Sequence, residues 1–228
     1  MTQPRTYVIA TKSSRFLAAF ERHRERLPGI WVTIGGSANL DVALLERLAP
    51  RYIFFPHWSW IVPASILSSF ECVCFHMTDL PYGRGGSPLQ NLIVRGHKDT
   101  KLSALKMTAE LDAGPIYMKA GLSLDGTAQD ILDRAYDLST RMICEIVADE
   151  PVPSPQAGSS ETFKRRTPSD SLLPQSVELL QLYDHIRMLD ADGYPRAFIA
   201  WGDMKISLDQ AKLADGKLVC RATIEKKD

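Results

Sequence analysis

The chain has 228 residues and a mass of 25.4 kDa, which is enough for one sizeable hydrophobic core and part of a second module. Its 27 Lys and Arg residues equal its 27 Asp and Glu residues, so no excess positive charge is available to bind a polyanion such as tRNA non-specifically. The composition therefore argues against nucleic acid as a partner.

The cysteines, histidines and apolar runs further restrict the kind of protein that this chain can be. The four cysteines form no Cys-x-x-Cys pair, and we interpret them as reduced thiols. The histidines at positions 57, 76 and 97 are too widely spaced for a metal motif, so no metal is predicted. The amino terminus lacks the basic segment and apolar core of a signal peptide, and no run approaches the roughly 18 apolar residues of a membrane span. These features predict a cytoplasmic protein with no membrane partner.

Short apolar runs alternate with helical patterns through the first two thirds of the chain, which is typical of a largely parallel sheet covered by helices. The predicted fold class is α/β, a Rossmann-like, doubly wound and mostly parallel sheet. Strands are predicted at residues 6–11, 30–34, 52–56, 72–76, 101–108 and 114–124, the last two as an antiparallel pair. Helices are predicted at residues 14–27, 40–49, 64–70, 87–96 and 127–150.

The pattern changes after Glu150, where five prolines and little periodicity predict an extended arm. Beyond the arm, residues 177–190 predict a helix whose apolar stripe would be Leu179, Leu180, Tyr183 and Ile186, with structural roles for His185 and Arg187. Three short strands follow, at residues 196–201, 204–214 and 217–224. We therefore predict a catalytic domain (1–150), an arm (151–176) and a small α+β subdomain (177–228), whose strand edges are a possible homodimer surface.

Two side chains are candidates for chemistry. His76 stands at the carboxyl end of the fourth predicted strand, where doubly wound sheets bind ligands, and an imidazole can accept or donate a proton near neutral pH. Its alternative role is to cap the strand by hydrogen bonding. Asp112 precedes Ala-Gly-Pro and therefore lies in a tight turn, where it could meet an imidazole or serve as an ordinary turn residue.

Two motifs carry a family resemblance. The segment FHMTDLPYGRGGSPLQNLIVRG (75–96), followed by ELDAGPIYM (110–118), resembles the folate-dependent formyltransferase family, to which methionyl-tRNA formyltransferase belongs. The family loop is Asn-x-His-x-x-x-Leu-Pro-x-x-Arg-Gly-x-x-Pro, and a Leu-Asp-x-Gly turn comes later in the chain. The residues in register with these motifs are His76, Leu80, Pro81, Arg84, Gly85, Pro88, Leu111, Asp112 and Gly114. Among members of the family, the nucleotide-sugar N-formyltransferases are judged the most similar.

The resemblance implies transfer of a formyl group from 10-formyltetrahydrofolate, as co-substrate, to an amine, without a metal. His76 would move the proton. Asp112 would hold the imidazole of His76 in orientation and stabilise positive charge as the proton moves. The resemblance implies cofactor contacts for Trp58, Ile61, Pro63, Leu111 and Gly114. It implies a substrate loop made of Arg84, Gly85, Gly86, Ser87, Pro88 and Asn91, with Arg84 anchoring the loop by bidentate pairing.

Cys74 departs from the family pattern, because it stands where the family has the asparagine that polarises the formyl carbonyl. A thiol is a poor hydrogen-bond donor. The oxyanion contact would then come from the Asn91 amide, a backbone N–H or a water, or the activity would be weak or lost.

The acceptor amine is predicted from the tail of the chain. Within the family, acceptors are methionyl-tRNA, a glycine-derived ribonucleotide and 4-amino sugars on nucleotide carriers. The tail here is short and not basic, unlike that of a tRNA enzyme, and FKRRTPSDSLL with LYDHIRMLDADGYPRAFI is similar to the tail of sugar N-formyltransferases. We predict a nucleotide-linked 4-amino sugar as the acceptor. The alternatives are another amine such as methionyl-tRNA, or a catalytically silent binding protein.

Overall fold

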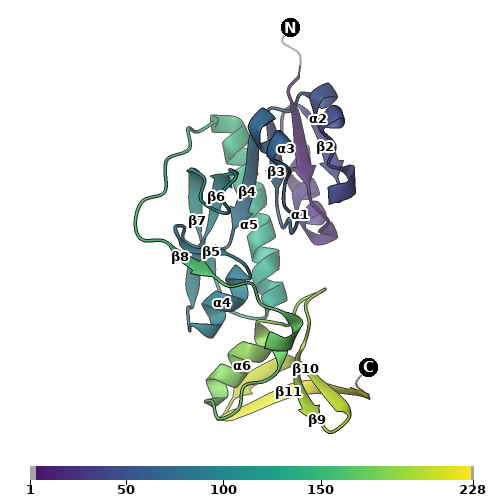
Figure 1. The fold of residues 1–228 in the computed structure, drawn as a ribbon, viewed down its shortest axis with the longest axis vertical. Coiled ribbons are helices and arrows are strands. Elements are labelled where there is room, and N and C mark those ends of the chain that lie inside the picture. Colours follow the sequence, from purple (N-terminus) through teal and green to yellow (C-terminus); the bar gives the residue numbers. More distant parts are fainter. Residues whose placement is uncertain (1–3, 227–228) are drawn as a thin grey trace. The chain divides into compact units, whose positions relative to one another are not determined.

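The computed structural model describes residues 4–226, which form two compact units, and each unit gathers several segments of the chain (Figure 1). The first contains the described residues up to Arg84, with Lys101–Leu122 and Asp133–Thr162. The second contains Gly85–Thr100, Ser123–Leu132 and the described residues from Phe163 onward. Residues 1–3, part of the stretch in which no signal peptide is predicted, lie outside the described residues. The domain division predicted at residues 150 and 176 stays a prediction.

A six-stranded sheet belongs to the first unit. Its spatial order is β2 (Ile30–Ile34), β1 (Thr6–Ala10), β3 (Tyr52–Phe55), β4 (Cys72–His76), β6 (Asp99–Lys106) and β7 (Ile116–Ser123). The first four strands run parallel, and β6 runs antiparallel to β4. The chain leaves β1 toward one edge and returns on the other side at β3, which creates a topological switch point at the carboxyl ends of the parallel strands. The predicted mostly parallel α/β sheet is confirmed.

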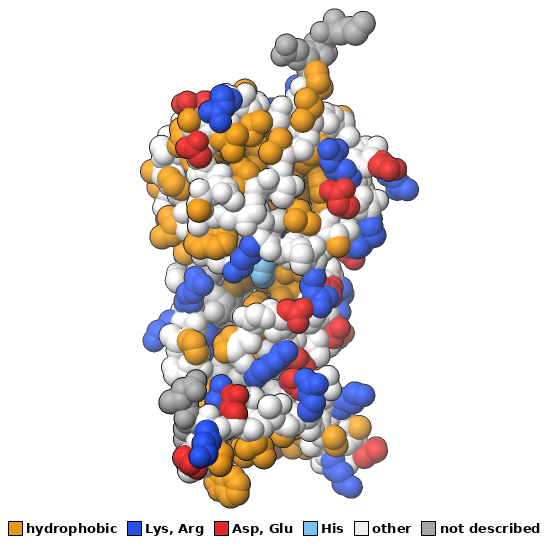
Figure 2. Space-filling view, turned by 90° about the vertical axis from the view of Figure 1, so that its right-hand side faces the viewer, with side chains coloured by type: hydrophobic (Ala, Val, Ile, Leu, Met, Phe, Trp, Pro, Cys, Tyr) orange, Lys and Arg blue, Asp and Glu red, His pale blue; other side chains and the backbone are white. Residues whose placement is uncertain are grey.

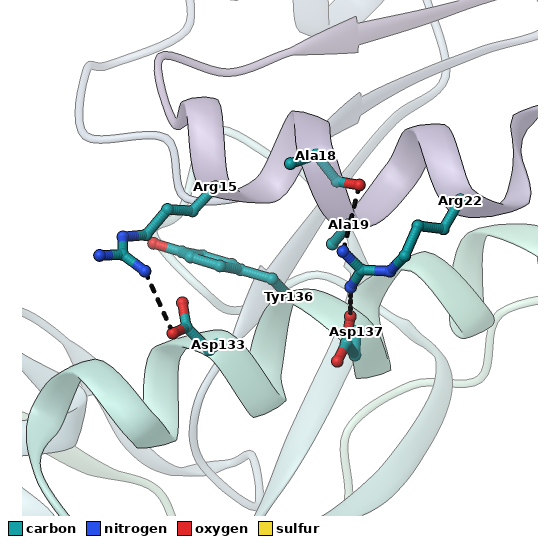
Figure 3. A pocket seen from close by; sticks show the side chains of 7 residues that line it. All are labelled: Arg15, Ala18, Ala19, Arg22, Asp133, Tyr136 and Asp137. Atoms are coloured by element: carbon teal, nitrogen blue, oxygen red, sulfur yellow. Dashed lines mark hydrogen bonds and ion pairs between the residues drawn. The ribbon is translucent and has the colours of Figure 1, made fainter.

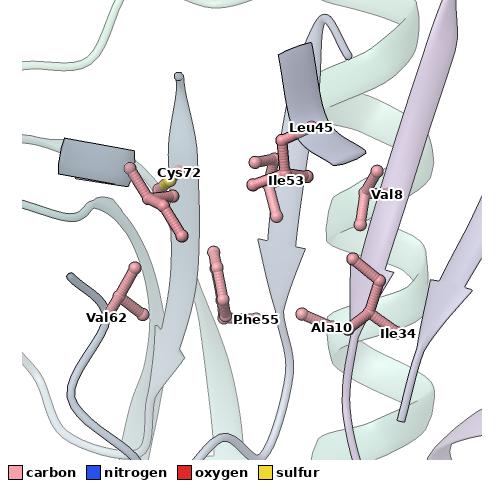
Figure 4. Close-up of a cluster of buried hydrophobic side chains, with 9 residues drawn as sticks. Val8, Ala10, Ile34, Leu45, Ile53, Phe55, Val62 and Cys72 are labelled. Carbon is pink, nitrogen blue, oxygen red and sulfur yellow. The ribbon is translucent and has the colours of Figure 1, made fainter. Parts of the chain in front are cut away.

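One face of this sheet carries an aliphatic core. Successive strand residues point to opposite faces, so alternate residues of β1 and β3 gather on this side. They pack against helices α2 (Val42–Leu48) and α3 (Ala64–Ser69). The buried cluster is Val8, Ala10, Ile34, Leu45, Ile53, Phe55, Val62, Ile66 and Cys72 (Figure 4). Burial of each large side chain of this kind contributes on the order of 1.5–3 kcal/mol.

The opposite face is aromatic, and two helices lie against it: α1 (Ser14–Arg24) and α5 (Ala128–Asp149). The ring of Phe20 from α1 lies 5.0 Å from that of Trp31 in β2. The ring of Phe16, also from α1, meets Tyr136 of α5 edge to face at 6.1 Å. Since helices cover both faces, the sheet is doubly wound as predicted. None of the helices within residues 4–226 is long and apolar enough to cross a membrane.

Two short strands are absent from the sequence prediction. These are β5 (Tyr82–Gly85) and β8 (Glu161–Phe163), which form a two-stranded sheet. Glycine is depleted in strands, so the two glycines of β5 give no strand pattern in the sequence. The segment predicted as an arm is therefore held in place, and it is also paired at Ser154, which exchanges two backbone hydrogen bonds with Ile116.

The second unit contains two helices and an antiparallel sheet. The helices are α4 (Pro88–Val94) and α6 (Leu179–Arg187), and the sheet order is β11 (Lys217–Lys226), β10 (Met204–Ala214) and β9 (Ala197–Trp201). The predicted helix and three strands are confirmed in type. β10 has the predicted bounds, and β11 continues two residues beyond its predicted end at residue 224. The two strands pair across an irregularity in their register.

Helix α6 buries Ile186 of the predicted stripe, but it leaves two of the predicted leucines exposed and buries polar side chains as well. Leu179 and Leu180 are 36% and 48% exposed, whereas Asp184 and Arg187 are buried. The Nε atom of Arg187 donates to Oδ1 of Asp184 at 2.7 Å. Its Nη1 atom donates to the carbonyl oxygen of Leu124 at 2.6 Å and to that of Gly126 at 2.8 Å. A buried cation needs hydrogen-bond acceptors of this kind. The spacing of hydrophobic residues does not predict which residues supply these acceptors.

Candidate active site

His76 is the last residue of β4, and it is 8% exposed. Its Nε2 atom lies 2.8 Å from the carbonyl oxygen of Gly83. Because a carbonyl oxygen only accepts hydrogen bonds, Nε2 carries the ring proton in this contact. In the neutral imidazole the basic lone pair is therefore on Nδ1.

Asp112 faces this second nitrogen. It occupies the turn between β6 and β7 with a φ of +53°, in the left-handed region that aspartate tolerates better than most residues. Its Oδ2 atom lies 3.6 Å from Nδ1 of His76, and the two side chains are only 11% and 9% exposed. This is an ion-pair distance, longer than a direct hydrogen bond. The structure thus brings His76 and Asp112 together, with the carboxylate beside Nδ1 of the imidazole.

A small pocket of about 40 Å³ lies beside Asp112. Burial raises the pKa of the Cys74 thiol far above its usual range, and the negative charge of Asp112 raises it further. The thiol is therefore protonated at neutral pH and is no thiolate nucleophile, although it can donate a weak S–H hydrogen bond. The pocket is lined by Cys74, Leu105, Lys106, Met107, Thr108, Leu111, Asp112 and Gly114.

Two of the predicted cofactor residues line this pocket. Leu111 is 70% exposed and so offers an apolar surface at its rim. Only glycine fits at position 114, because a Cβ atom there would lie 1.8 Å from the carbonyl oxygen of Lys106. The turn that carries Asp112 can approach β6 this closely only with a glycine at position 114.

The other predicted cofactor residues lie between β3 and α3. Trp58 packs edge to face on Phe55, with ring centroids 5.4 Å apart, and its buried Nε1 atom has no hydrogen-bond partner within residues 4–226. Ile61 is 96% exposed, and Pro63 precedes α3 as its N-cap. The folate-binding roles of Trp58, Ile61 and Pro63 stay predictions.

Arg84 has the bidentate anchor that the sequence predicts, and the acceptor is an amide. Its Nε and Nη2 atoms donate to Oε1 of Gln156 at 3.1 and 2.8 Å. Its Nη1 atom lies 3.4 Å from a carboxylate oxygen of Glu110. Gln156 is absent from the predicted site, and its only sequence signal is a polar side chain in a proline-rich segment.

The rest of the predicted substrate loop, from Gly85 through Pro88 to Asn91, belongs to the second unit. Ser87 is the N-cap of α4 and Pro88 its first residue, but the Ser87 hydroxyl makes no capping bond and accepts from the backbone N–H of Arg166 at 3.1 Å. Gly86 lies against Arg165, so closely that a Cβ atom at position 86 would be 2.4 Å from the Cβ of Arg165. The space left by the missing side chain of Gly86 is thus filled by another part of the same chain.

Asn91 is held inside the same loop. Its amide nitrogen donates to the carbonyl oxygens of Gly86, Ser87 and Lys164 at 3.0–3.1 Å. Its Oδ1 atom accepts from Arg95 at 2.9 Å. To act as the oxyanion donor suggested for it, the Asn91 amide would have to leave these carbonyls. A backbone N–H or a water remains the simpler substitute for the family asparagine.

A larger pocket, of about 280 Å³, lies between α1 and α5 (Figure 3). Two ion pairs cross it: Arg15 to Asp133 at 3.4 Å, and Arg22 to Asp137 at 2.5 Å. Its charges are balanced, and none of the predicted site residues lines it. Four of the predicted site residues, Cys74, Leu111, Asp112 and Gly114, line the smaller pocket instead.

Other reactive groupings are not found in the part of the chain that the structure describes. Residues 4–226 contain no group of three or more His, Cys, Asp or Glu side chains placed to hold a metal ion. Cys72, Cys74, Cys144 and Cys220 are free thiols.

The switch-point sheet and the His76–Asp112 pair define a doubly wound α/β protein with a nearly buried histidine–carboxylate pair at the carboxyl ends of its parallel strands. A solved methionyl-tRNA formyltransferase from Clostridium thermocellum has the same fold, with a TM-score of 0.95. Its sequence is 41% identical, over 98% of this chain and 100% of that one. The chain therefore belongs to the folate-dependent formyltransferase family, as the sequence motifs predict.

More distant comparisons agree on the family. Residues 168–225 match the family model described as methionyl-tRNA formyltransferase, C-terminal domain. The methionyl-tRNA formyltransferase of Rickettsia bellii (strain RML369-C) is 27% identical over 184 residues. That match covers 78% of this chain but only 57% of the Rickettsia protein, so the chain spans little more than half the length of this relative.

A 4-N formyltransferase from Francisella tularensis shares the fold, with a TM-score of 0.70 over 98% of each chain, but is only 14% identical. Since the Clostridium protein is 41% identical, these figures do not favour the predicted special similarity to nucleotide-sugar N-formyltransferases.

Proposed function

We propose that this chain is an N-formyltransferase that moves the formyl group of 10-formyltetrahydrofolate to an amine. The observation that carries the proposal is the placement of His76 and Asp112. They are distant in the sequence, yet lie 3.6 Å apart in a nearly buried site that adjoins a pocket. Membership of the formyltransferase family supports the same reaction.

The proposed chemistry uses the two nitrogens of His76 differently. The Gly83 carbonyl holds Nε2–H, so Nδ1 is the base that takes the proton from the attacking amine. The amine nitrogen bonds to the formyl carbon and forms a tetrahedral intermediate. When the bond to the folate nitrogen breaks, the proton passes from Nδ1 to that nitrogen, which leaves tetrahydrofolate and the formylated amine. Asp112 stabilises the imidazolium that exists between these two transfers.

Two acceptors deserve testing, for different reasons. Methionyl-tRNA is supported by the names of the Clostridium and Rickettsia relatives and by the family model over residues 168–225. A nucleotide-linked 4-amino sugar is supported by the charge balance of 27 basic and 27 acidic residues. Both signs are interspersed over the face in Figure 2, whereas a tRNA-binding surface normally carries a basic patch. A homodimer through the C-terminal sheet is a further proposal, based on the outer edge of β11, which pairs with no other strand among the described residues.

The experiment is a panel assay. The purified chain and 10-formyltetrahydrofolate are mixed with methionyl-tRNA or with a set of nucleotide-linked 4-amino sugars. The folate product is followed by absorbance, and the acceptor mass is checked for one added formyl group. We expect one acceptor class to gain the formyl group. Folate binding with no transfer to any amine would instead indicate the silent binding protein.

Cys74→Asn is expected to raise kcat about tenfold, because an amide N–H is a much better oxyanion donor than a thiol, and one such donor is worth roughly 100-fold in related sites. Cys74→Ala, which removes the S–H group, is the matched control and should lower kcat. Steady-state kinetics of both variants would check this. An unchanged or lower kcat in Cys74→Asn would show that another group already supplies the donor.

A further inference from the structure

Gln156 links two segments that hold His76. Its Nε2 atom donates to the carbonyl oxygens of Asp112 at 2.7 Å and Gly114 at 2.8 Å. Its Oε1 atom accepts from Nε and Nη2 of Arg84 at 3.1 and 2.8 Å. Carbonyls only accept and a guanidinium only donates, so these partners fix the orientation of the amide. Both of its hydrogens and its oxygen are thereby used.

Two of the three residues that Gln156 contacts, Arg84 and Asp112, adjoin or carry a group that contacts the imidazole. Arg84 directly follows Gly83, whose carbonyl oxygen accepts from Nε2 of His76. Asp112 carries the carboxylate that lies 3.6 Å from Nδ1. The two groups that contact the ring nitrogens are therefore tied to each other through one glutamine side chain.

The segment that carries Gln156 is itself fixed. Ser154 exchanges two backbone hydrogen bonds with Ile116 of β7, at 2.7 and 2.8 Å. Pro153 and Pro155 flank Ser154 and restrict the backbone to an extended path. Gln156 follows directly and is half-buried. A side chain supported in this way can hold a turn whose Asp112 φ is +53°.

We propose that Gln156 is a positioning residue for formyl transfer, which sets the distance between the Asp112 carboxylate and the His76 imidazole. The inference rests on the proposed function. Gln156 does not touch the reacting atoms and acts through the Asp112 turn and the Gly83–Arg84 segment. A displacement of about 1 Å in such a pair can cost on the order of 100-fold in rate.

The kinetic test compares Gln156→Ala, Gln156→Glu and Gln175→Ala. Gln156→Glu keeps an oxygen for Arg84 but sets a second oxygen against the carbonyls of Asp112 and Gly114, to which it cannot donate. We expect both Gln156 variants to lose 10- to 100-fold in kcat, with KM for folate changed by less than threefold. Gln175, an exposed glutamine later in the chain, is the matched control and should leave kcat unchanged. A Gln156→Glu variant with wild-type kcat would overturn the proposal, because the contact with Arg84 alone would then suffice.

A second readout is independent of transfer activity. The ring nitrogens of His76 are followed by NMR in 15N-histidine-labelled protein, with His76→Gln used to assign the signal. Both Gln156 variants should shift the His76 signal, while Gln175→Ala should not. If the wild-type chain formylates no amine, the proposed function fails, but this shift still tests the positioning. An unshifted His76 signal in folded Gln156→Ala protein would contradict it.

Discussion

Replacing His76 by alanine is expected to lower kcat at least 100-fold, because a general base in the right place contributes on the order of 100- to 10,000-fold. Asp112→Asn should have a similar effect, since the amide keeps the shape but loses the charge that stabilises the imidazolium beside it. Initial rates with the acceptor identified in the panel assay would measure both.

His76→Ala also removes a buried hydrogen bond to Gly83, so a loss of activity could reflect a loss of structure. His76→Gln separates the two effects, because its amide can donate to the same carbonyl but cannot take up a proton. It should be as inactive as His76→Ala while unfolding at a temperature close to that of the wild type. His23→Ala, on α1, is the control for loss of a histidine and should keep full activity. Turnover within threefold of wild type in His76→Gln would refute the assignment.

Arg187→Ala is expected to lower the free energy of unfolding by about 3–5 kcal/mol, the cost of leaving one partner of a buried ion pair without the other. Arg187 is 3% exposed, and its removal strands the Asp184 carboxylate and the carbonyls of Leu124 and Gly126. Arg187→Lys should recover only part of the loss, because an ammonium cannot reproduce the planar fork of a guanidinium.

The matched control for Arg187 is Arg15→Ala. Arg15 pairs with Asp133 at 3.4 Å, and both side chains are about half exposed, at 49% and 45%. Exposed pairs of this kind contribute about 0–1 kcal/mol. Urea unfolding of the full-length variants would compare the two arginines. A loss under about 1 kcal/mol in Arg187→Ala would mean that water satisfies the stranded acceptors.

The chain's periodicity predicts the sheet and its helices because the forces that form them are local. Strands such as β3 alternate between two buried faces, and helices such as α1 repeat their apolar residues at helical spacing. The misses have non-local causes. β5 contains two glycines and pairs with β8, which is far along the chain, and the buried face of α6 depends on carbonyls that belong to other segments.

In the candidate site, too, some residues are predicted from the sequence and others are not. The motifs predict His76, Asp112 and Arg84 because their residue types are specific to the chemistry. The acceptor for Nε2 of His76 is the backbone of Gly83, and every residue has a carbonyl, so no side-chain pattern could reveal it. Gln156 is equally hidden, because the three residues that it contacts, Arg84, Asp112 and Gly114, lie in two segments distant from it in sequence.

A crystal structure of the chain with 5-formyltetrahydrofolate, a stable isomer of the proposed donor, would test most directly whether His76 and Asp112 form the formyl-transfer site. We expect the formyl-bearing edge of the pterin to lie at the pocket between Cys74 and Asp112, within hydrogen-bond reach of Nδ1 of His76. Folate bound between α1 and α5 instead, or with its formyl group turned away from His76, would contradict it.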